Sequence, residues 1–118
     1  MTIKERMMED TQYFPVYKFL LDLGIVEAMI LSILIDMDSF ASNRAFDDNT
    51  FFKCTDNFLL SIGNLNITAP TIKKYFDKFV NQGYIQVRII NHQNTNCRYV
   101  KINQDKLIKK YSDYMKSR

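Results

Sequence analysis

Hydrophobic residues recur at helical spacing in four stretches of the chain, which predicts four helices. The helices begin at Ile25, after Thr55 or Asp56, after Thr68, and after Asn103. Three further stretches alternate or cluster in a way typical of strands: 50–54, 84–90 and 97–102. The six-residue polar segment 91–96 separates the last two strands, so together they predict a β-hairpin. The pattern therefore predicts an α+β fold that is mainly helical.

The apolar stripes predict which residues form the core. The helix over 25–38 should bury Ile25, Met29, Ile30, Ile33, Leu34 and Met37. The helix over 68–82 should bury Ile72, Phe76, Phe79 and Val80, and the last helix, over 104–116, should bury Leu107, Ile108, Tyr111 and Met115. The opposite face of that last helix should expose Lys106, Lys109, Lys110 and Asp113.

The ends of the two central helices carry recognisable signals. Asn66 tolerates the left-handed conformation that ends a helix, and Thr68 is a good N-cap for the next one. Pro70 falls in the first turn, where its missing N–H costs nothing. Gly83 then stops that helix. A tight joint at residues 65–68 is expected to connect the two helices.

Other segments look like connections. Residues 1–12 read as a polar leader, and 13–118 as a single domain. Pro15 favours an extended aromatic segment around it, followed by a brief helical turn over 18–23 that ends at Gly24. The polar stretch 39–49 is expected to be a loop.

Charge is unevenly distributed. Residues 1–68 hold five basic and ten acidic residues, a net charge of −5, whereas residues 69–118 hold eleven basic and three acidic residues, a net charge of +8. This asymmetry points to an anionic partner facing the C-terminal half, although a solvated helix face would give the same pattern. The chain has no apolar run of membrane-spanning length and no apolar leader, so we expect a cytoplasmic protein that is not bound to a membrane.

The order of these parts resembles a winged helix-turn-helix domain. Leu65-Asn66-Ile67-Thr68, followed by Thr71-Ile72, is similar to the turn of winged-helix DNA-binding domains, and Gly83-Tyr84-Ile85 is similar to their usual exit into the wing. The resemblance implies a small antiparallel hairpin as the wing and a C-terminal helix after it.

A second resemblance covers roughly residues 13–110. The stretches that carry it are Leu20-Leu21-Asp22-Leu23-Gly24-Ile25, Leu34-Ile35-Asp36, Cys54-Thr55, and Arg98-Tyr99-Val100-Lys101-Ile102-Asn103-Gln104-Asp105-Lys106-Leu107. They are similar to the N-terminal domain of plasmid replication initiators and phage replisome organisers of Gram-positive bacteria. That family often continues into a second domain, so the chain is expected to be either a small protein by itself or an isolated domain. Ala69-Pro70, Asp77 and Gly63 depart from the family pattern.

The resemblance implies that the 68–82 helix lies in the major groove of duplex DNA and that the 84–102 wing reaches the backbone or an adjacent groove. The residues expected to contact DNA are Thr68, Thr71, Lys73, Lys74, Lys78, Arg88, His92, Gln93, Asn94, Asn96 and Arg98. The lysines suit phosphates, and the amides suit base edges. The Asn-rich tip also has a simpler interpretation, because asparagine accommodates turn geometry.

Enzymatic chemistry is not expected. His92 is the only histidine, so neither a His-based triad nor a typical zinc site is available, and we expect no cofactor. Cys54 and Cys97 lie on strands that often pair, so they are either core thiols or a disulfide.

Two functions remain open from the sequence. The first is a DNA-binding protein of a mobile element, plasmid or phage-like, acting in replication initiation or transcription regulation. The second is a winged-helix adaptor that docks a replication or transcription protein without binding DNA. The last helix would either pack on the 25–38 helix or form a homodimer with a second copy.

Overall fold

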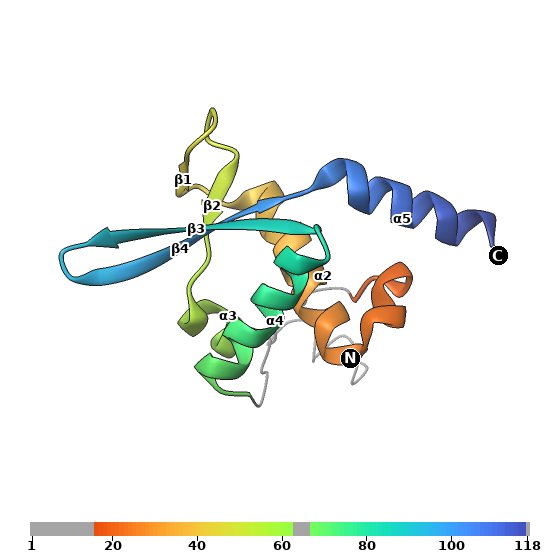
Figure 1. Ribbon diagram of the computed structural model, residues 1–118, viewed down its shortest axis with the longest axis horizontal. Helices are drawn as coiled ribbons and strands as arrows, with labels where there is room; N and C mark the ends of the chain where they lie inside the picture. The colour runs from red at the N-terminus through yellow and green to blue at the C-terminus, as the bar shows by residue number, and fades with distance from the viewer. Residues whose placement is uncertain (1–15, 63–66, 118) are drawn as a thin grey trace, which may run out of the picture.

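The computed structural model describes residues 16–62 and 67–117 (Figure 1). Its elements are the 3₁₀ helix η1 (Lys18–Leu23), α2 (Ile25–Phe40), β1 (Arg44–Ala45), β2 (Phe51–Lys53), α3 (Asp56–Ile62), α4 (Ala69–Asn81), β3 (Ile85–His92), β4 (Thr95–Ile102) and α5 (Gln104–Lys116). The fold is therefore α+β, as the hydrophobic pattern predicts. None of the described helices is both long enough and apolar enough to cross a membrane.

The strands form one antiparallel sheet in the order β1-β2-β4-β3. Phe52 of β2 lies opposite Val100 of β4, and Ile85 of β3 lies opposite Ile102 of β4. The predicted strand around 50–54 is thus confirmed, and its pairing with β4 brings the two halves of the chain together.

Helix α2 supplies more of the core than any other described element. Its buried side chains belong to Ala28, Ile30, Leu31, Ser32, Ile33, Leu34 and Met37. The buried Ser32 hydroxyl accepts a hydrogen bond of 3.0 Å from the Tyr17 backbone N–H, which ties η1 to the helix. The prediction that Ile25 is buried is wrong. Ile25 is 61% exposed because it opens the helix almost a full turn before Ala28, the first fully buried residue.

Helices α3 and α4 form as the sequence predicts, with one difference in capping. Thr55 Oγ1 accepts a hydrogen bond from the Phe58 N–H at 3.1 Å and caps α3. Thr68 occupies the N-cap position of α4, but its hydroxyl makes no backbone cap and instead pairs with Thr71 Oγ1 at 3.1 Å. The joint expected around Asn66, with Gly63 before it, lies outside the described residues.

Helix α4 ends as Gly83 predicts. Gly83 has a φ of +81°, its N–H donates to Val80 O, and the Tyr84 N–H donates to Phe79 O, both at 3.0 Å. This pair of bonds is a Schellman motif, which turns the chain directly into β3. The prediction that Val80 is buried is wrong: it lies on the flank of the helix and is exposed, while Ile72, Phe76 and Phe79 form the buried face.

The β3–β4 hairpin is longer than expected. The predicted six-residue loop over 91–96 is wrong, because the strands continue to His92 and resume at Thr95. Only Gln93 and Asn94 form the turn, with φ values of +50° and +65°, as in the two-residue turn that suits twisted strands. The outer half of the hairpin extends beyond the rest of the sheet (Figure 1).

The predicted loop over 39–49 contains the short strand β1 and a left-handed turn. Four consecutive residues, 46–49, have positive φ values between 43° and 63°. The turn packs Phe46 edge-on against Phe51 at 5.6 Å and against Tyr99 at 5.9 Å, measured between ring centroids. Phe51 is thereby fully buried on the sheet face that lies away from the main core.

Asn103 is the N-cap of α5, and its Oδ1 accepts a hydrogen bond from the Lys106 N–H at 3.2 Å. The prediction that its whole apolar stripe is inside is wrong, because of this stripe only Leu107 is buried. Ile108, Tyr111 and Met115 are exposed, although Tyr111 meets the ring of Phe19 edge-on with centroids 5.4 Å apart. Lys110, expected outside, points toward η1 and forms an ion pair with Asp22.

Candidate nucleic-acid interface

The outer face of α4 is set by its hydrophobic spacing. Ile72, Phe76 and Phe79 point into the core at helical spacing, so the residues between them must point outward. Lys73, Lys74 and Lys78 are accordingly exposed. Thr68 and Thr71 lie at the N-terminal end of the same helix, where unpaired backbone N–H groups favour anions.

Two of the three α4 lysines have carboxylate partners. Lys73 forms an ion pair of 3.0 Å with Asp77 one turn later, and both side chains are more than 60% exposed. Lys78 donates a hydrogen bond of 2.9 Å to Glu27 of α2, which holds the pKa of that carboxyl below its ordinary value of 4.5. Among the described residues, Lys74 has no carboxylate partner.

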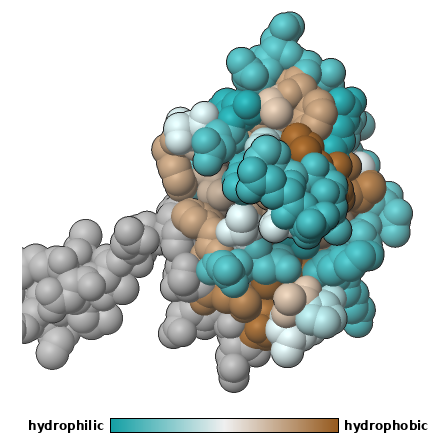
Figure 2. Space-filling view, turned by 90° about the vertical axis from the view of Figure 1, so that its left-hand side faces the viewer, coloured by the Kyte–Doolittle hydropathy of each residue, from teal (hydrophilic) through white to brown (hydrophobic). Residues whose placement is uncertain are grey.

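The tip of the β3–β4 hairpin is polar and exposed from His92 to Asn96. Asn91 donates a side-chain hydrogen bond of 3.0 Å to Asn96 across the strands, so that pair is partly satisfied within the hairpin. Figure 2 views the molecule from the side toward which the hairpin points, and the centre of this view is mainly hydrophilic. The tip of the hairpin therefore exposes several side-chain amides and the imidazole of His92.

Arg88 lies on the sheet face away from the main core. Its guanidinium carbon is 4.9 Å from the ring centroids of both Phe46 and Phe51, and it forms an ion pair of 3.6 Å with Asp47. The left-handed turn thus holds this arginine by stacking and charge together. About half of its side chain is still exposed.

Arg98 points toward the core side of the sheet. It forms an ion pair of 2.6 Å with Asp56 at the start of α3, and its guanidinium lies 4.3 Å from the ring centroid of Phe76 on α4. Its side chain is only 15% exposed. The residue therefore links α3, α4 and β4, and it does not lie with the exposed lysines of α4.

The sequence already held a signal for this inward orientation. Alternate residues of a strand point to the same face, and Arg98 has the same parity as the buried Val100 and Ile102. The partners Glu27, Asp47 and Asp56 are the residues that sequence reasoning missed. They could not be found from spacing, because each comes from a distant segment.

The uneven charge of the chain is partly neutralised inside the fold. Among the residues that the structure describes, four ion pairs join an acidic residue of the first 68 positions to a basic residue of the remainder. They are Lys78–Glu27, Arg88–Asp47, Arg98–Asp56 and Lys110–Asp22. The excess of positive charge in the C-terminal half is therefore smaller at the surface than the sequence indicates.

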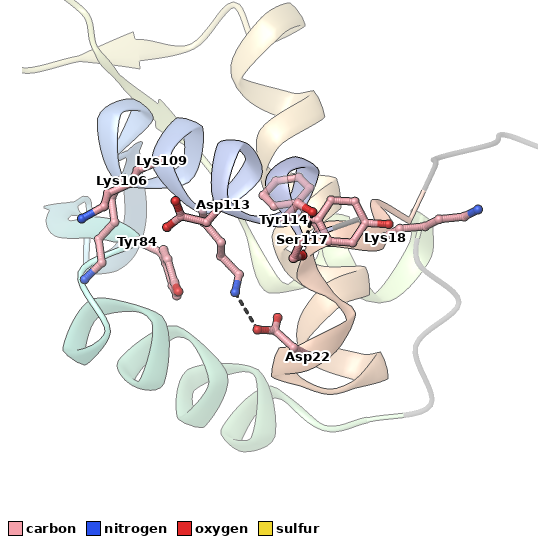
Figure 3. Close-up of a pocket in the computed structure, with 10 residues that line it drawn as sticks. Lys18, Asp22, Tyr84, Lys106, Lys109, Asp113, Tyr114 and Ser117 are labelled. Carbon is pink, nitrogen blue, oxygen red and sulfur yellow. Dashed lines mark hydrogen bonds and ion pairs between the residues drawn. The ribbon is translucent and has the colours of Figure 1, made fainter.

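A second group of lysines surrounds a pocket of about 670 Å³ between α5 and η1 (Figure 3). Lys18, Lys106, Lys109 and Lys110 line it. Lys110 is held by Asp22 at 2.8 Å, Lys106 donates to Gln82 O, and Asp113 lies among the lysines. Asp22 and Asp113 thus offset part of the positive charge around this pocket.

The described residues contain no group of three or more His, Cys, Asp or Glu side chains able to hold a metal ion.

Cys54 and Cys97 are free thiols in the structure. Burial raises the pKa of Cys54 to about 12, against the opposing effect of the nearby Arg98. The backbone neighbour of Cys54 across the sheet is Arg98, to whose carbonyl oxygen the Cys54 N–H donates at 2.9 Å, whereas Cys97 lies opposite Ile90.

No protein-family model matches the chain, and no curated protein or solved structure is significantly similar to it. Its function must therefore be inferred from the geometry of its own residues.

Proposed function

We propose that the chain is a winged helix-turn-helix protein that binds duplex DNA, with α4 in the major groove and the β3–β4 hairpin as the wing. The role we infer is replication initiation or transcription regulation on a plasmid or phage-like element. The observation that carries the proposal is the outer face of α4, where Thr68, Lys73, Lys74 and Lys78 share one exposed surface.

The existing ion pairs do not prevent this surface from binding phosphate. Exposed pairs such as Lys73–Asp77 are worth about 0–1 kcal/mol, so a DNA phosphate can replace the carboxylate at little cost. Lys74 has no carboxylate to give up among the described residues. By contrast, Arg98 is committed to Asp56 and Phe76, so we exclude it from the contact set and assign it a structural role.

The wing contributes its exposed tip. Gln93 and Asn94 stand at the turn, where their amides can meet a phosphate or a base edge. His92 and Asn96 flank them on the two strands. Arg88 joins the contact set only after Asp47 releases it, because the ion pair at 3.6 Å is half exposed and therefore weak.

The test is a fluorescence-anisotropy titration with a labelled random duplex at several salt concentrations. Lys73→Ala combined with Lys74→Ala should weaken binding and reduce the slope of log affinity against log salt by about 2, since each lost phosphate contact removes about 0.9. The matched control is Lys109→Ala with Lys116→Ala, which removes the same charge from exposed positions of α5. The control should leave the slope unchanged, and an equal change in both variants would contradict the assignment.

The wing has its own test. Gln93→Gly with Asn94→Gly removes both tip side chains but retains a dipeptide suited to positive φ. We expect duplex affinity to fall several-fold while the melting temperature stays close to that of the wild type. If affinity is unchanged, the tip serves only as a turn.

A protein-docking adaptor is the second candidate. The observation in its favour is that four of the five basic residues expected at the DNA surface already have carboxylate partners. Absence of duplex binding at about 50 mM salt, where non-specific binding is strong, would favour the adaptor.

A further inference from the structure

The first turn of α4 carries two exposed apolar residues, Ala69 and Pro70, which depart from the family pattern. Neither belongs to the hydrophobic core, whose buried α4 members are Ile72, Phe76 and Phe79. Helix α4 runs from the lower edge of the molecule up to the sheet, so its first turn lies at one end of the fold (Figure 1). The two side chains are therefore open to a partner.

Ala69 and Pro70 stand one helical turn ahead of the lysines of α4. Residues four apart are neighbours on a helix surface, so Ala69 adjoins Lys73 and Pro70 adjoins Lys74. When a recognition helix lies in the major groove, its N-terminal residues face the base edges. With α4 docked in this way, the lysines contact phosphates and the two apolar residues contact bases.

This turn has little capacity for hydrogen bonds to bases. Guanine and adenine are read mainly by arginine, lysine, asparagine and glutamine, and residues 69–72 include none of these types. The hydroxyls of Thr68 and Thr71 pair at 3.1 Å, so only one of their two hydroxyl hydrogens remains to be donated. What the turn presents is carbon, as the methyl group of Ala69 and the ring of Pro70.

We propose that Ala69 and Pro70 contact the C5-methyl groups of thymine, so that the chain prefers duplexes with A·T pairs under the first turn of α4. This inference rests on the proposed function. Thymine is the only one of the four bases that presents a methyl group in the major groove, and apolar side chains such as alanine contact it there. Burying one methyl group strengthens binding about fourfold.

The wild-type chain tests the proposal with two pairs of duplexes that differ only in methyl groups. The first pair is an alternating A·T duplex made with thymine or with uracil. The second is an alternating G·C duplex made with 5-methylcytosine or with cytosine, which separates the methyl group from the shape of A·T DNA. Anisotropy titrations at one salt concentration should show tighter binding to the methylated member of each pair. We expect about four- to sixteenfold, for one or two buried methyl groups.

Two double variants separate the base contacts from the phosphate contacts. Ala69→Ser with Pro70→Ser replaces the apolar side chains by small polar ones and should bind the thymine and uracil duplexes equally. Lys73→Ala with Lys74→Ala should weaken binding to both duplexes and keep the ratio of the two affinities, because it removes phosphate contacts alone. If circular dichroism shows that the first variant has lost its helices, Ala69→Ser alone replaces it.

Leu21→Ser with Ile25→Ser is the matched control, because it makes the same kind of change at apolar positions of η1 and α2 that are 45% and 61% exposed. It should retain the wild-type ratio. Equal wild-type affinities within either pair of duplexes, or a control that loses the ratio, overturn the methyl contact while duplex binding itself stands. Tighter binding to the unmethylated G·C duplex than to the thymine duplex also overturns it. Absence of binding to every duplex overturns both this inference and the proposed function.

Discussion

Arg98 of β4 and Asp56 of α3 form an ion pair 2.6 Å long beneath the hairpin, and the guanidinium of Arg98 also covers the ring of Phe76. From the sequence, Arg98 was expected to contact a DNA phosphate, because it lies in the predicted wing that follows the lysine-bearing 68–82 helix. In the fold, one side chain joins three elements that supply the candidate interface. Its main effect should therefore be on stability.

Arg98→Ala should lower the free energy of unfolding by about 1–3 kcal/mol, because Asp56 loses its charged partner in a site that is only partly exposed. Urea denaturation measures this loss. Lys73→Ala is the control and should change the free energy of unfolding by less than about 0.5 kcal/mol, since its ion pair is fully at the surface. If Arg98→Ala keeps its stability but loses duplex binding, Arg98 contacts DNA and the structural role assigned to it is wrong.

Glu27→Gln tests the bond between α2 and α4. The pKa of Glu27 is lowered in the folded chain by its hydrogen bond from Lys78, so ionised Glu27 stabilises the fold above its ordinary pKa of 4.5 and loses this effect as the pH falls through the lowered value. The variant should be less stable than the wild type by about 0.5–1 kcal/mol at pH 7, and the difference should shrink below pH 4.5. Urea denaturation across pH 3–7 gives both values.

The same substitution has an opposite effect on DNA binding. Glu27 competes with phosphate for Lys78, so Glu27→Gln should tighten duplex binding and steepen its salt dependence while it weakens the fold. Weaker duplex binding by a folded Glu27→Gln variant would mean that Lys78 does not contact DNA.

The two thiols should differ in reactivity. Cys54 is fully buried with a pKa raised to about 12, whereas Cys97 is partly exposed. Because the thiolate is the reactive form, a thiol-specific reagent should modify one cysteine per native chain at pH 8, and peptide mapping should identify it as Cys97. Cys54 should react only in denaturant. Rapid modification of both would show that the strand β2 opens readily.

The hairpin turn can be improved. Gln93 and Asn94 both have positive φ, a conformation that Asn-Gly adopts with less strain. Gln93→Asn with Asn94→Gly should raise the free energy of unfolding by about 0.5–1 kcal/mol, seen as a higher melting temperature. Gln93→Val should lower it, since β-branched residues avoid this region. If Gln93→Val were more stable than the Asn-Gly variant, residues 93 and 94 would not have the positive φ values described here.

Local signals were sufficient for most of the secondary structure. Thr55, Asn103 and Gly83 mark helix ends through their own side chains or their lack of one, so a sequence carries that information directly. The core face of α4 was also predictable, because Ile72, Phe76 and Phe79 repeat at helical spacing. The apolar stripe of α5 shows the limit of the same rule. Spacing predicts the stripe but not how far each of its residues is buried.

Local sequence signals could not predict the left-handed turn over 46–49 or the ion pairs between distant segments. Asp47-Asp48-Asn49 reads as a polar loop, and nothing local says that it carries Phe46 onto Phe51 and Asp47 onto Arg88. Those contacts exist because β2 pairs with β4, whose sequence is about fifty residues away. The candidate interface was therefore predicted as a set of cations, while the carboxylates that restrain them were not.

The four ion pairs between the acidic and basic halves also bear on how the chain reaches its fold. The unfolded chain is a polymer with opposite charge on its two halves, so the halves attract each other before any side chain is packed. That attraction favours the distant β2–β4 contact, which is otherwise slow to form because of the long loop that it closes. Added salt should therefore slow refolding more than it speeds unfolding.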